Sequence, residues 1–312
     1  MKPIYSIVVP IYNETCCLDA LYSRLSEVMD STGEPWELVL VDDGSKDGST
    51  EMIRQLAQKD ARVRPVIFAR NFGHQIAVTA GMDYSRGDAV TIIDADLQDP
   101  PEVILDLIAK WKEGYEVVYA VRAEREGETW FKMFTASLFY RIIYKITDVD
   151  IPMDTGDFRL LDRKVVNVLG SMKEHHRFLR GMGAWVGFRQ IGVPYRRAAR
   201  FAGETHYPFR KMFKLALNAI TGFSYFPLQL ATYLGFISAG LSIITIPIVV
   251  IMRLAGDQAF FGQASTLIAV LFLGGVQLIS LGILGEYIGR IYDEVKGRPL
   301  YIVSEAPSDE NT

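Results

Sequence analysis

Two aspartates that directly follow an apolar run are the residues of this chain best suited to bind a divalent metal. Asp94 and Asp96 come after Ile92 and Ile93 and precede Pro100–Pro101, which ends the segment. Residues two apart on an extended chain point to the same side, so both carboxylates can face one ion. Magnesium sites use one or two carboxylates and complete their shell with water and substrate phosphates. The spacing favours an ion bound together with a nucleotide, although a solvated loop behind a buried strand would have the same pattern.

Three further polar clusters follow predicted strands in the same way. They are Tyr12–Glu14, Asp42–Ser45 and Arg70–His74. From residue 4 to about residue 121, short β-rich runs alternate with amphipathic segments, which is the pattern of a mostly parallel α/β sheet with helices on both faces. Ligands of such sheets bind beyond the carboxyl ends of the strands. We therefore predict that all four clusters lie on one rim of the sheet.

The predicted elements are local segments of ordinary length. We expect strands at residues 4–11, 36–41, 63–69, 89–93 and 116–121, with helices at residues 16–29, 49–59, 75–84 and 102–112. The first strand is not followed by the Gly-x-Gly-x-x-Gly of dinucleotide-binding folds, and the sequence contains no P-loop. The phosphates of a bound nucleotide would then need a metal and basic side chains.

Composition separates the chain into a polar part and an apolar part. Hydrophobic residues make up 49% of the 312 residues, yet 22% of the residues are charged. The net charge of −4 gives no general argument for nucleic-acid binding. Cys16 and Cys17 are adjacent and are the only cysteines, which excludes a disulfide framework and fits a reducing compartment. His175 and His176 lack the spacing of a metal site, so we expect them on a solvated surface.

Two uncharged segments in the last third of the chain are long enough to cross a membrane. Residues 226–252 and 264–285 contain no charged side chain, and each exceeds the roughly 20 residues that span a bilayer. Basic residues precede the first segment and follow the second, so the positive-inside rule puts both termini in the cytoplasm. The apolar start of the chain is too short for a signal peptide. We predict a cytoplasmic domain over residues 1–222, a membrane region over 223–290 with helices at about 226–252 and 264–288, and a cytoplasmic tail over 291–312.

Two segments before the first span are suited to a membrane surface. Residues 129–147 mix aromatic and aliphatic side chains with lysine and arginine, as interfacial helices do. We expect a second interfacial helix at residues 208–222, and an ordinary helix packed on the sheet is the alternative for the first. The basic run from Arg196 to Lys214 would attract anionic lipid head groups with about 1 kcal/mol for each side chain.

The polar clusters resemble the sugar-nucleotide motifs of family 2 inverting glycosyltransferases with the GT-A fold. The matching stretches are Val8–Glu14, Val41–Ser45 and Asp94–Glu102. The likeness is strongest to the polyprenyl-phosphate glycosyltransferases, which include dolichyl-phosphate mannose synthases and bacterial undecaprenyl-phosphate glucosyltransferases. The resemblance implies that the nucleoside lies among Pro10, Tyr12, Glu14 and Asp43, that Asp94 lies near ribose and sugar, and that Asp96 and Gln98, with Asp94 beside them, hold Mg²⁺ or Mn²⁺.

The same resemblance implies roles on the acceptor side. Asp157 would lie near the reacting carbon of the sugar, at the position often called the base. Arg200 and Lys211 match positions that face phosphates, and Arg122 is a further candidate for that task. A phosphate monoester is largely a dianion at neutral pH and needs no proton removed. We therefore expect Asp157 to orient the acceptor or a sugar hydroxyl, or to help hold the metal, instead of acting as a base.

Together these features predict a membrane-anchored, inverting glycosyltransferase of the bacterial plasma membrane. Its acceptor would be undecaprenyl phosphate and its favoured donor UDP-glucose, while donors of mannose, N-acetylglucosamine or a formyl-amino-arabinose stay open. Processive polysaccharide synthases share the donor domain but usually carry a Gln-x-x-Arg-Trp motif and more spans, and this sequence has neither. A non-catalytic nucleotide-sugar sensor is the alternative from another class. Homo-oligomerisation stays open, and a nucleic-acid partner is not expected.

Overall fold

The computed structural model describes residues 2–122, 155–197, 221–222, 224–255 and 263–307. Its strands are β1 (Tyr5–Ile11), β2 (Trp36–Asp42), β3 (Val63–Phe68), β4 (Ala89–Ile92), β5 (Val117–Arg122), β6 (Thr155–Asp162), β7 (Gln190–Tyr195) and β8 (Val303–Glu305). Its helices are α1 (Leu18–Asp30), α2 (Ser49–Lys59), α3 (His74–Tyr84), α4 (Val103–Lys112), α6 (Arg163–Ser171), α7 (Leu179–Trp185), α9 (Phe226–Leu254) and α10 (Gln263–Val295). The five strands and four helices predicted up to residue 122 are confirmed to within two residues at each end. Strands β6, β7 and β8 were not predicted.

The strands form one sheet in the order β7-β5-β6-β4-β1-β2-β3-β8. Strand β1 lies inside the sheet and pairs in parallel with β2 and β4, while β2 pairs in parallel with β3. Strand β6 runs antiparallel between β4 and β5, and β8 runs antiparallel along the free edge of β3. The sheet is therefore a mixed one with a parallel centre, and the predicted α/β class is confirmed.

Both faces of the sheet are covered by helices because alternate strand residues point to opposite sides. On one face, Ile7 and Val9 of β1 pack into a core with residues of α1, α2 and α4. On the other face, Val8 packs with residues of α3, α6 and α7. Every residue of β1 is buried, which explains why its sequence is nearly continuous in apolar residues.

The ends of the strands bring distant segments to one rim. The parallel strands β1 to β4 all finish there, so the loops after Ile11, Asp42, Phe68 and Ile92 are neighbours. Because β6 is antiparallel to β4, with Arg159 paired to Ile92, the first residues of β6 lie at this same rim. The predicted gathering of four polar clusters is confirmed, and Asp157 of β6 joins them.

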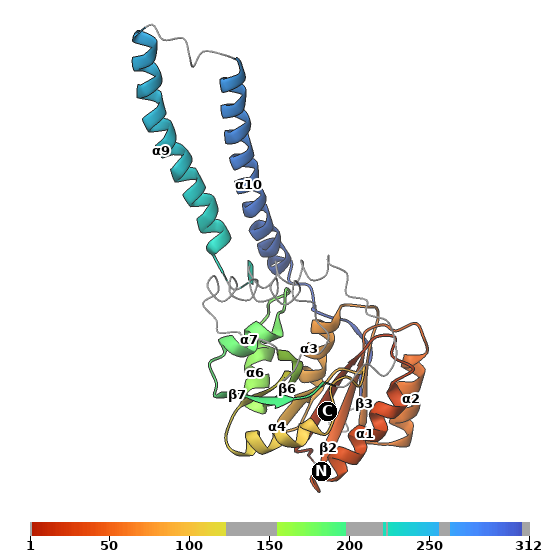
Figure 1. Cartoon of the computed structure of the whole chain (residues 1–312). Helices are drawn as coiled ribbons and strands as arrows, with labels where there is room; N and C mark the ends of the chain where they lie inside the picture. The colour runs from red at the N-terminus through yellow and green to blue at the C-terminus, as the bar shows by residue number, and fades with distance from the viewer. Residues whose placement is uncertain (1, 123–154, 198–220, 223, 256–262, 308–312) are drawn as a thin grey trace.

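Helices α9 and α10 have the length and composition of membrane spans. Residues 226–252 and 266–295 each contain an 18-residue window with a mean hydropathy of 2.4, and no part of that window is buried against the rest of the protein. Figure 1 shows both helices extending away from the sheet domain. Their apolar side chains therefore need lipid around them, and the chain is membrane-associated. The expected interfacial helix at 129–147, and all but the last two residues of the one at 208–222, lie outside the described residues.

The last turn of α10 lies against the sheet domain. His175 donates from its backbone N to Oε1 of Glu294 at 2.8 Å, and its Nδ1 lies 3.0 Å from Oε2 of the same side chain. His176 Nε2 lies 3.3 Å from Asp293. His176 is exposed, as expected of a solvated surface, whereas His175 is only partly exposed because the end of α10 packs beside it. No local pattern around residue 175 could indicate this contact. Beyond this point, β8 adds to the sheet within the predicted tail.

Candidate active site

An open cleft of about 580 Å³ lies at the rim where β1, β2 and β3 end. Tyr12 lines it from the β1 side with 48% of its surface exposed. The Arg70 guanidinium lies 4.0 Å from the ring centre of Phe72 at the opposite wall. The remaining lining residues are Asp42, Gly44, Ser45, Lys46, Thr50, Ile67, Phe68, Ala69 and Asn71. The cleft combines the exposed ring of Tyr12 with the hydroxyl residues Ser45 and Thr50 and the basic residues Lys46 and Arg70. Such a lining suits a polar, planar ligand.

The two adjacent aspartates of the β2 end have different surroundings. Asp42 borders the cleft but is fully buried, and its carboxylate accepts from Ser45 N at 2.9 Å and from the hydroxyl of Thr50. Asp43 is also buried, but its carboxylate accepts from Phe72 N at 2.6 Å and from Gly73 N at 2.9 Å, in the loop after β3. Burial raises the pKa of Asp43 above its ordinary value, against the effect of these two amides. Asp43 thus holds the backbone just before α3 in place, behind the cleft wall.

Asp157 is the centre of a polar cluster beside the cleft. Arg180 Nε donates to its Oδ1 at 2.9 Å, and Gln75 Nε2 donates to its Oδ2 at 3.0 Å. His74 Nε2 lies 3.2 Å from Oδ2 of Asp157 and 3.6 Å from Oδ1 of Asp94. The carboxylate of Asp157 on β6 is therefore held by the first two residues of α3 and by one residue of α7.

The charges of this cluster stabilise one another. Burial alone would raise the pKa of Asp157, but Arg180 and His74 outweigh it and hold that pKa well below the ordinary value. Desolvation opposes protonation of His74, yet its hydrogen bond to Asp157 and the charge of Asp94 raise its pKa to about 9. Burial raises the pKa of Asp94 to about 6, with the charge of His74 acting against that rise. Near neutral pH the cluster holds two cations beside Asp157.

The loop after β4 has the geometry of a ligand-binding turn. Asp96 Oδ1 accepts from Gln98 N at 3.1 Å, and Leu97 between them has a φ of 56°, in the left-handed region that branched side chains disfavour. Asp94 Oδ1 and Asp99 Oδ2 are buried and accept no hydrogen bond from any residue that the structure describes. Buried carboxylate oxygens without a hydrogen-bond donor fit a hard divalent cation, which takes oxygen ligands.

A second group of polar side chains borders this loop. Arg197 Nε lies 3.3 Å from Oδ1 of Asp99, and its Nη2 lies 4.0 Å from Oδ2 of Asp96. Tyr195 donates its hydroxyl proton to Asp99 and lies 3.5 Å from Nε of Arg122. Arg122 also lies close to the start of β6: a Cβ atom added to Gly156 would lie 3.1 Å from Nη2 of Arg122. The Arg122 position is therefore next to Asp157.

The structure brings most of the predicted site residues to this rim. Tyr12, Asp94, Asp96, Gln98, Arg122 and Asp157 lie on it, Pro10 lies in the buried end of β1, and Glu14 follows in the loop before α1. Arg200 and Lys211 lie outside the described residues. Sequence reasoning did not select His74, Gln75, Arg180 and Arg197. His74 belonged to a predicted rim cluster, whereas nothing in the sequence around Arg180 marked it.

Comparison with known proteins assigns the family. The family described as Glycosyl transferase family 2 matches residues 6–170, and the one described as GtrB C-terminal hairpin matches residues 226–291. The "Uncharacterized glycosyltransferase YkcC" of Bacillus subtilis is 54% identical over 98% of this chain and 95% of its own. The "SfII prophage-derived bactoprenol glucosyl transferase" of Shigella flexneri is 43% identical over 96% of this chain and 97% of its own. With a GT-A-type sheet, an acidic rim and these relatives along nearly its whole length, the chain belongs to glycosyl transferase family 2 and is a glycosyltransferase.

Proposed function

We propose that this enzyme transfers glucose from UDP-glucose to undecaprenyl phosphate and inverts the anomeric carbon. One observation carries the proposal. The 43% identity to a bactoprenol glucosyl transferase extends over 96% of this chain, so it includes the apolar hairpin as well as the sugar-nucleotide domain. A likeness that includes the membrane part supports a shared lipid acceptor, because that part adjoins the bilayer where a polyprenyl phosphate is dissolved.

The donor would bind in the cleft and extend toward Asp94. In this arrangement Tyr12 contacts the nucleoside, Pro10 and Glu14 support the same loop, and Asp43 acts by holding the backbone of Phe72 and Gly73. The diphosphate would then point along the rim from the β2 end toward the β4 end. The cleft and the acidic turn lie on that line, which supports this placement.

Asp96, Gln98 and Asp94 would hold a divalent cation, Mg²⁺ or Mn²⁺. The buried Asp94 oxygen without a hydrogen bond among the described residues supports this assignment. When bound, the ion supplies positive charge that stabilises the diphosphate leaving group. Arg197, close to Asp96 and Asp99, adds a fixed charge on the same side.

The transfer itself needs no proton removed from the acceptor. A phosphate oxygen of the dianionic acceptor forms the new bond to the anomeric carbon, and the bond from that carbon to UDP breaks with its electron pair on the diphosphate. Asp157 is fixed by three donors, so its part would be to hold His74 and Arg180 as cations beside the reacting groups. Arg122, Arg200 and Lys211 would bind the acceptor phosphate. Positioning of this kind supplies much of the rate in displacement reactions.

We infer that the enzyme is a two-span protein of the bacterial plasma membrane. The catalytic domain and both termini would face the cytoplasm, where sugar nucleotides are available. The basic residues before α9 and after α10 support this orientation by the positive-inside rule.

The decisive experiment uses the full-length protein in detergent with undecaprenyl phosphate and either Mg²⁺ or Mn²⁺. Radiolabelled UDP-glucose, UDP-N-acetylglucosamine, GDP-mannose and the UDP-linked formyl-amino-arabinose are supplied one at a time. We expect label in the lipid phase from UDP-glucose, and loss of that signal on chelation and in Asp96→Ala. Transfer from another donor would replace glucose in the proposal, and tight nucleotide binding without any transfer would contradict it in favour of a sensor.

A further inference from the structure

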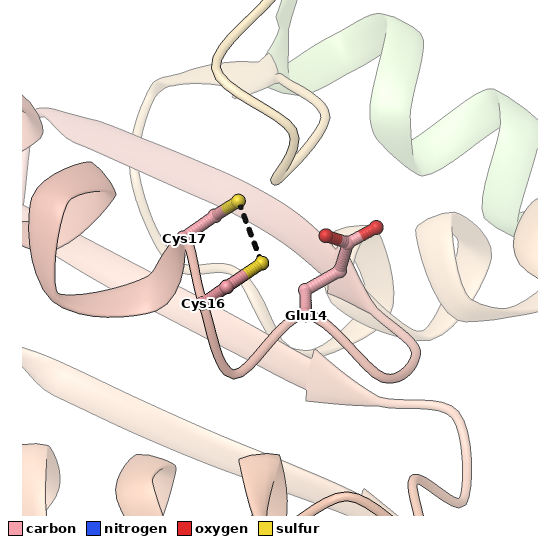
Figure 2. Close-up of side chains that lie close together, drawn as sticks. All are labelled: Glu14, Cys16 and Cys17. Atoms are coloured by element: carbon pink, nitrogen blue, oxygen red, sulfur yellow. Dashed lines mark hydrogen bonds between the residues drawn. The ribbon is translucent and has the colours of Figure 1, made fainter. Parts of the chain in front are cut away.

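The only two cysteines of the chain lie side by side directly before α1. Their sulfur atoms are 3.2 Å apart, with Cys17 buried and Cys16 exposed. One carboxylate oxygen of Glu14 and the two sulfur atoms all lie within 4.8 Å of one another. Figure 2 shows the three side chains pointing to the same side of the loop that links β1 to α1. The cluster has the donor spacing of a metal site.

The loop that carries these side chains is held from outside. Glu14 N donates to Ser49 Oγ at 3.1 Å, Thr15 N donates to Asp47 Oδ2 at 3.1 Å, and Cys17 N donates to Glu14 O at 3.1 Å. The first two bonds tie the loop to the start of α2 and to the segment just before it. Because the backbone is fixed before any ion binds, little conformational entropy remains to be lost on binding.

The donor set indicates which kind of ion would bind. Thiolates select zinc and other thiophilic cations, whereas Mg²⁺ takes oxygen ligands. Burial and the neighbouring Cys16 raise the pKa of Cys17 to about 12, so an ion must displace a thiol proton to bind there. Three protein ligands leave one tetrahedral position open for water or a substrate oxygen.

We propose that Glu14, Cys16 and Cys17 form a second cation site, specific for thiophilic divalent ions such as Zn²⁺ and Cd²⁺ and distinct from the oxygen site of Asp94 and Asp96. Since Glu14 belongs to the residues proposed to surround the nucleoside, an ion there weakens donor binding. This second consequence rests on the proposed function, whereas ion binding does not.

The first test titrates the reduced full-length protein in detergent with CdCl₂ and follows the ultraviolet charge-transfer band of cadmium thiolate. We expect the band to saturate at one equivalent and to survive a large excess of Mg²⁺. Cys16→Ser, at an exposed position that tolerates serine, should lose about half the band, since one of the two thiolates remains. Glu14→Gln should keep the band but weaken the affinity, while the control Glu51→Gln on α2 should change neither. Absence of a band with both thiols reactive, or its displacement by Mg²⁺, would overturn the site.

The second test measures the Kd for UDP-glucose with and without Zn²⁺. We expect Zn²⁺ to raise this Kd by about tenfold, within the usual range of coupling between sites. At the same zinc concentration we expect a smaller rise in Cys16→Ser, because one thiolate fewer holds the ion. An equal rise in Cys16→Ser would place the effect of zinc elsewhere and overturn the coupling. If UDP-glucose does not bind even without zinc, the proposed function fails while the cadmium band still decides the ion site.

Discussion

Arg180 donates from Nε to Oδ1 of Asp157 over 2.9 Å, across 23 positions of sequence and from a different element of the fold. With His74 and Gln75 on the other oxygen, both oxygens of the Asp157 carboxylate accept from protein donors. A carboxylate held in this way, with its pKa well below the ordinary value, has little affinity for a proton. This geometry is what the proposed positioning role of Asp157 requires.

Asp157→Asn should reduce the transfer rate by about 10²-fold, because loss of the anion displaces His74 and Arg180. The ratio of wild-type to variant rate should not fall between about pH 5.5 and about pH 8, across the second ionisation of the acceptor phosphate. It should grow where His74 of the variant loses its proton, because Asp157 no longer raises the pKa of His74. Steady-state transfer assays at several pH values check this, with the exposed Asp106→Asn on α4 as control. Recovery of the variant once the acceptor is a dianion would contradict positioning and support proton removal.

Gly44 is needed where the β2 end meets the loop after β3. Its φ is +72°, and a Cβ there would lie 2.6 Å from Asn71 N, so Gly44→Ala should both strain the backbone and push apart two walls of the cleft. We expect a loss of unfolding free energy well above the roughly 1–2 kcal/mol of the left-handed conformation alone, and weaker binding of UDP. Gly48→Ala is the matched control, because its φ is +99° with nothing within 4 Å of the added carbon. Equal effects of both substitutions on UDP binding, measured by calorimetry, would rule out the contact as the cause.

The returning chain after α10 supports the cleft through Tyr301. Its ring stacks on Phe68 with centroids 5.2 Å apart, and its hydroxyl donates to Asp83 Oδ2 at 2.9 Å. Phe68 lines the cleft, so Tyr301→Leu should raise the KM for the donor several-fold with kcat little changed, and should cost about 1–3 kcal/mol of stability. Donor saturation curves and thermal melting measure both effects. Tyr292→Leu, at an exposed position of α10, should leave the KM unchanged, and a similar rise there would point to a general effect of the helix.

The contact between His175 and Glu294 should make docking of the α10 end depend on pH. The hydrogen bonds of His175 to Glu294 and to the carbonyl of Arg298 raise its pKa above 6.5, and the charge of Asp293 adds to this. A raised folded-state pKa means that the stabilisation is complete below about pH 6.5 and is lost as the pH rises through the folded value. Hydrogen exchange at the β8 amides should therefore accelerate as the pH rises through that range, beyond the intrinsic pH effect seen in free peptide. Glu294→Gln should remove this extra dependence, and its persistence in the variant would show that another group is responsible.

The sequence by itself determined the features that depend on local pattern. Alternating apolar runs and amphipathic segments place β1 to β5 and α1 to α4, since the periods of strand and helix are properties of neighbouring residues. Helices α9 and α10 were found for the same reason, because each contains an uncharged stretch long enough to cross a bilayer. The carboxylates of Asp94 and Asp96 were found by spacing, and the rim by the rule that parallel strands end together.

Only the tertiary structure decided which side chains meet. His74 and Asp157 are 83 residues apart and come together because β6 inserts antiparallel between β4 and β5, a pairing that no local period reveals. The same holds for β8, which has three residues and acquires its place from the edge of β3. At Asp42 and Asp43 the sequence presents two equal carboxylates, yet in the folded chain Asp42 accepts from Ser45 N and Thr50, whereas Asp43 accepts from the backbone before α3. Long-range pairing and side-chain direction belong to the folded chain, so the site is complete only there.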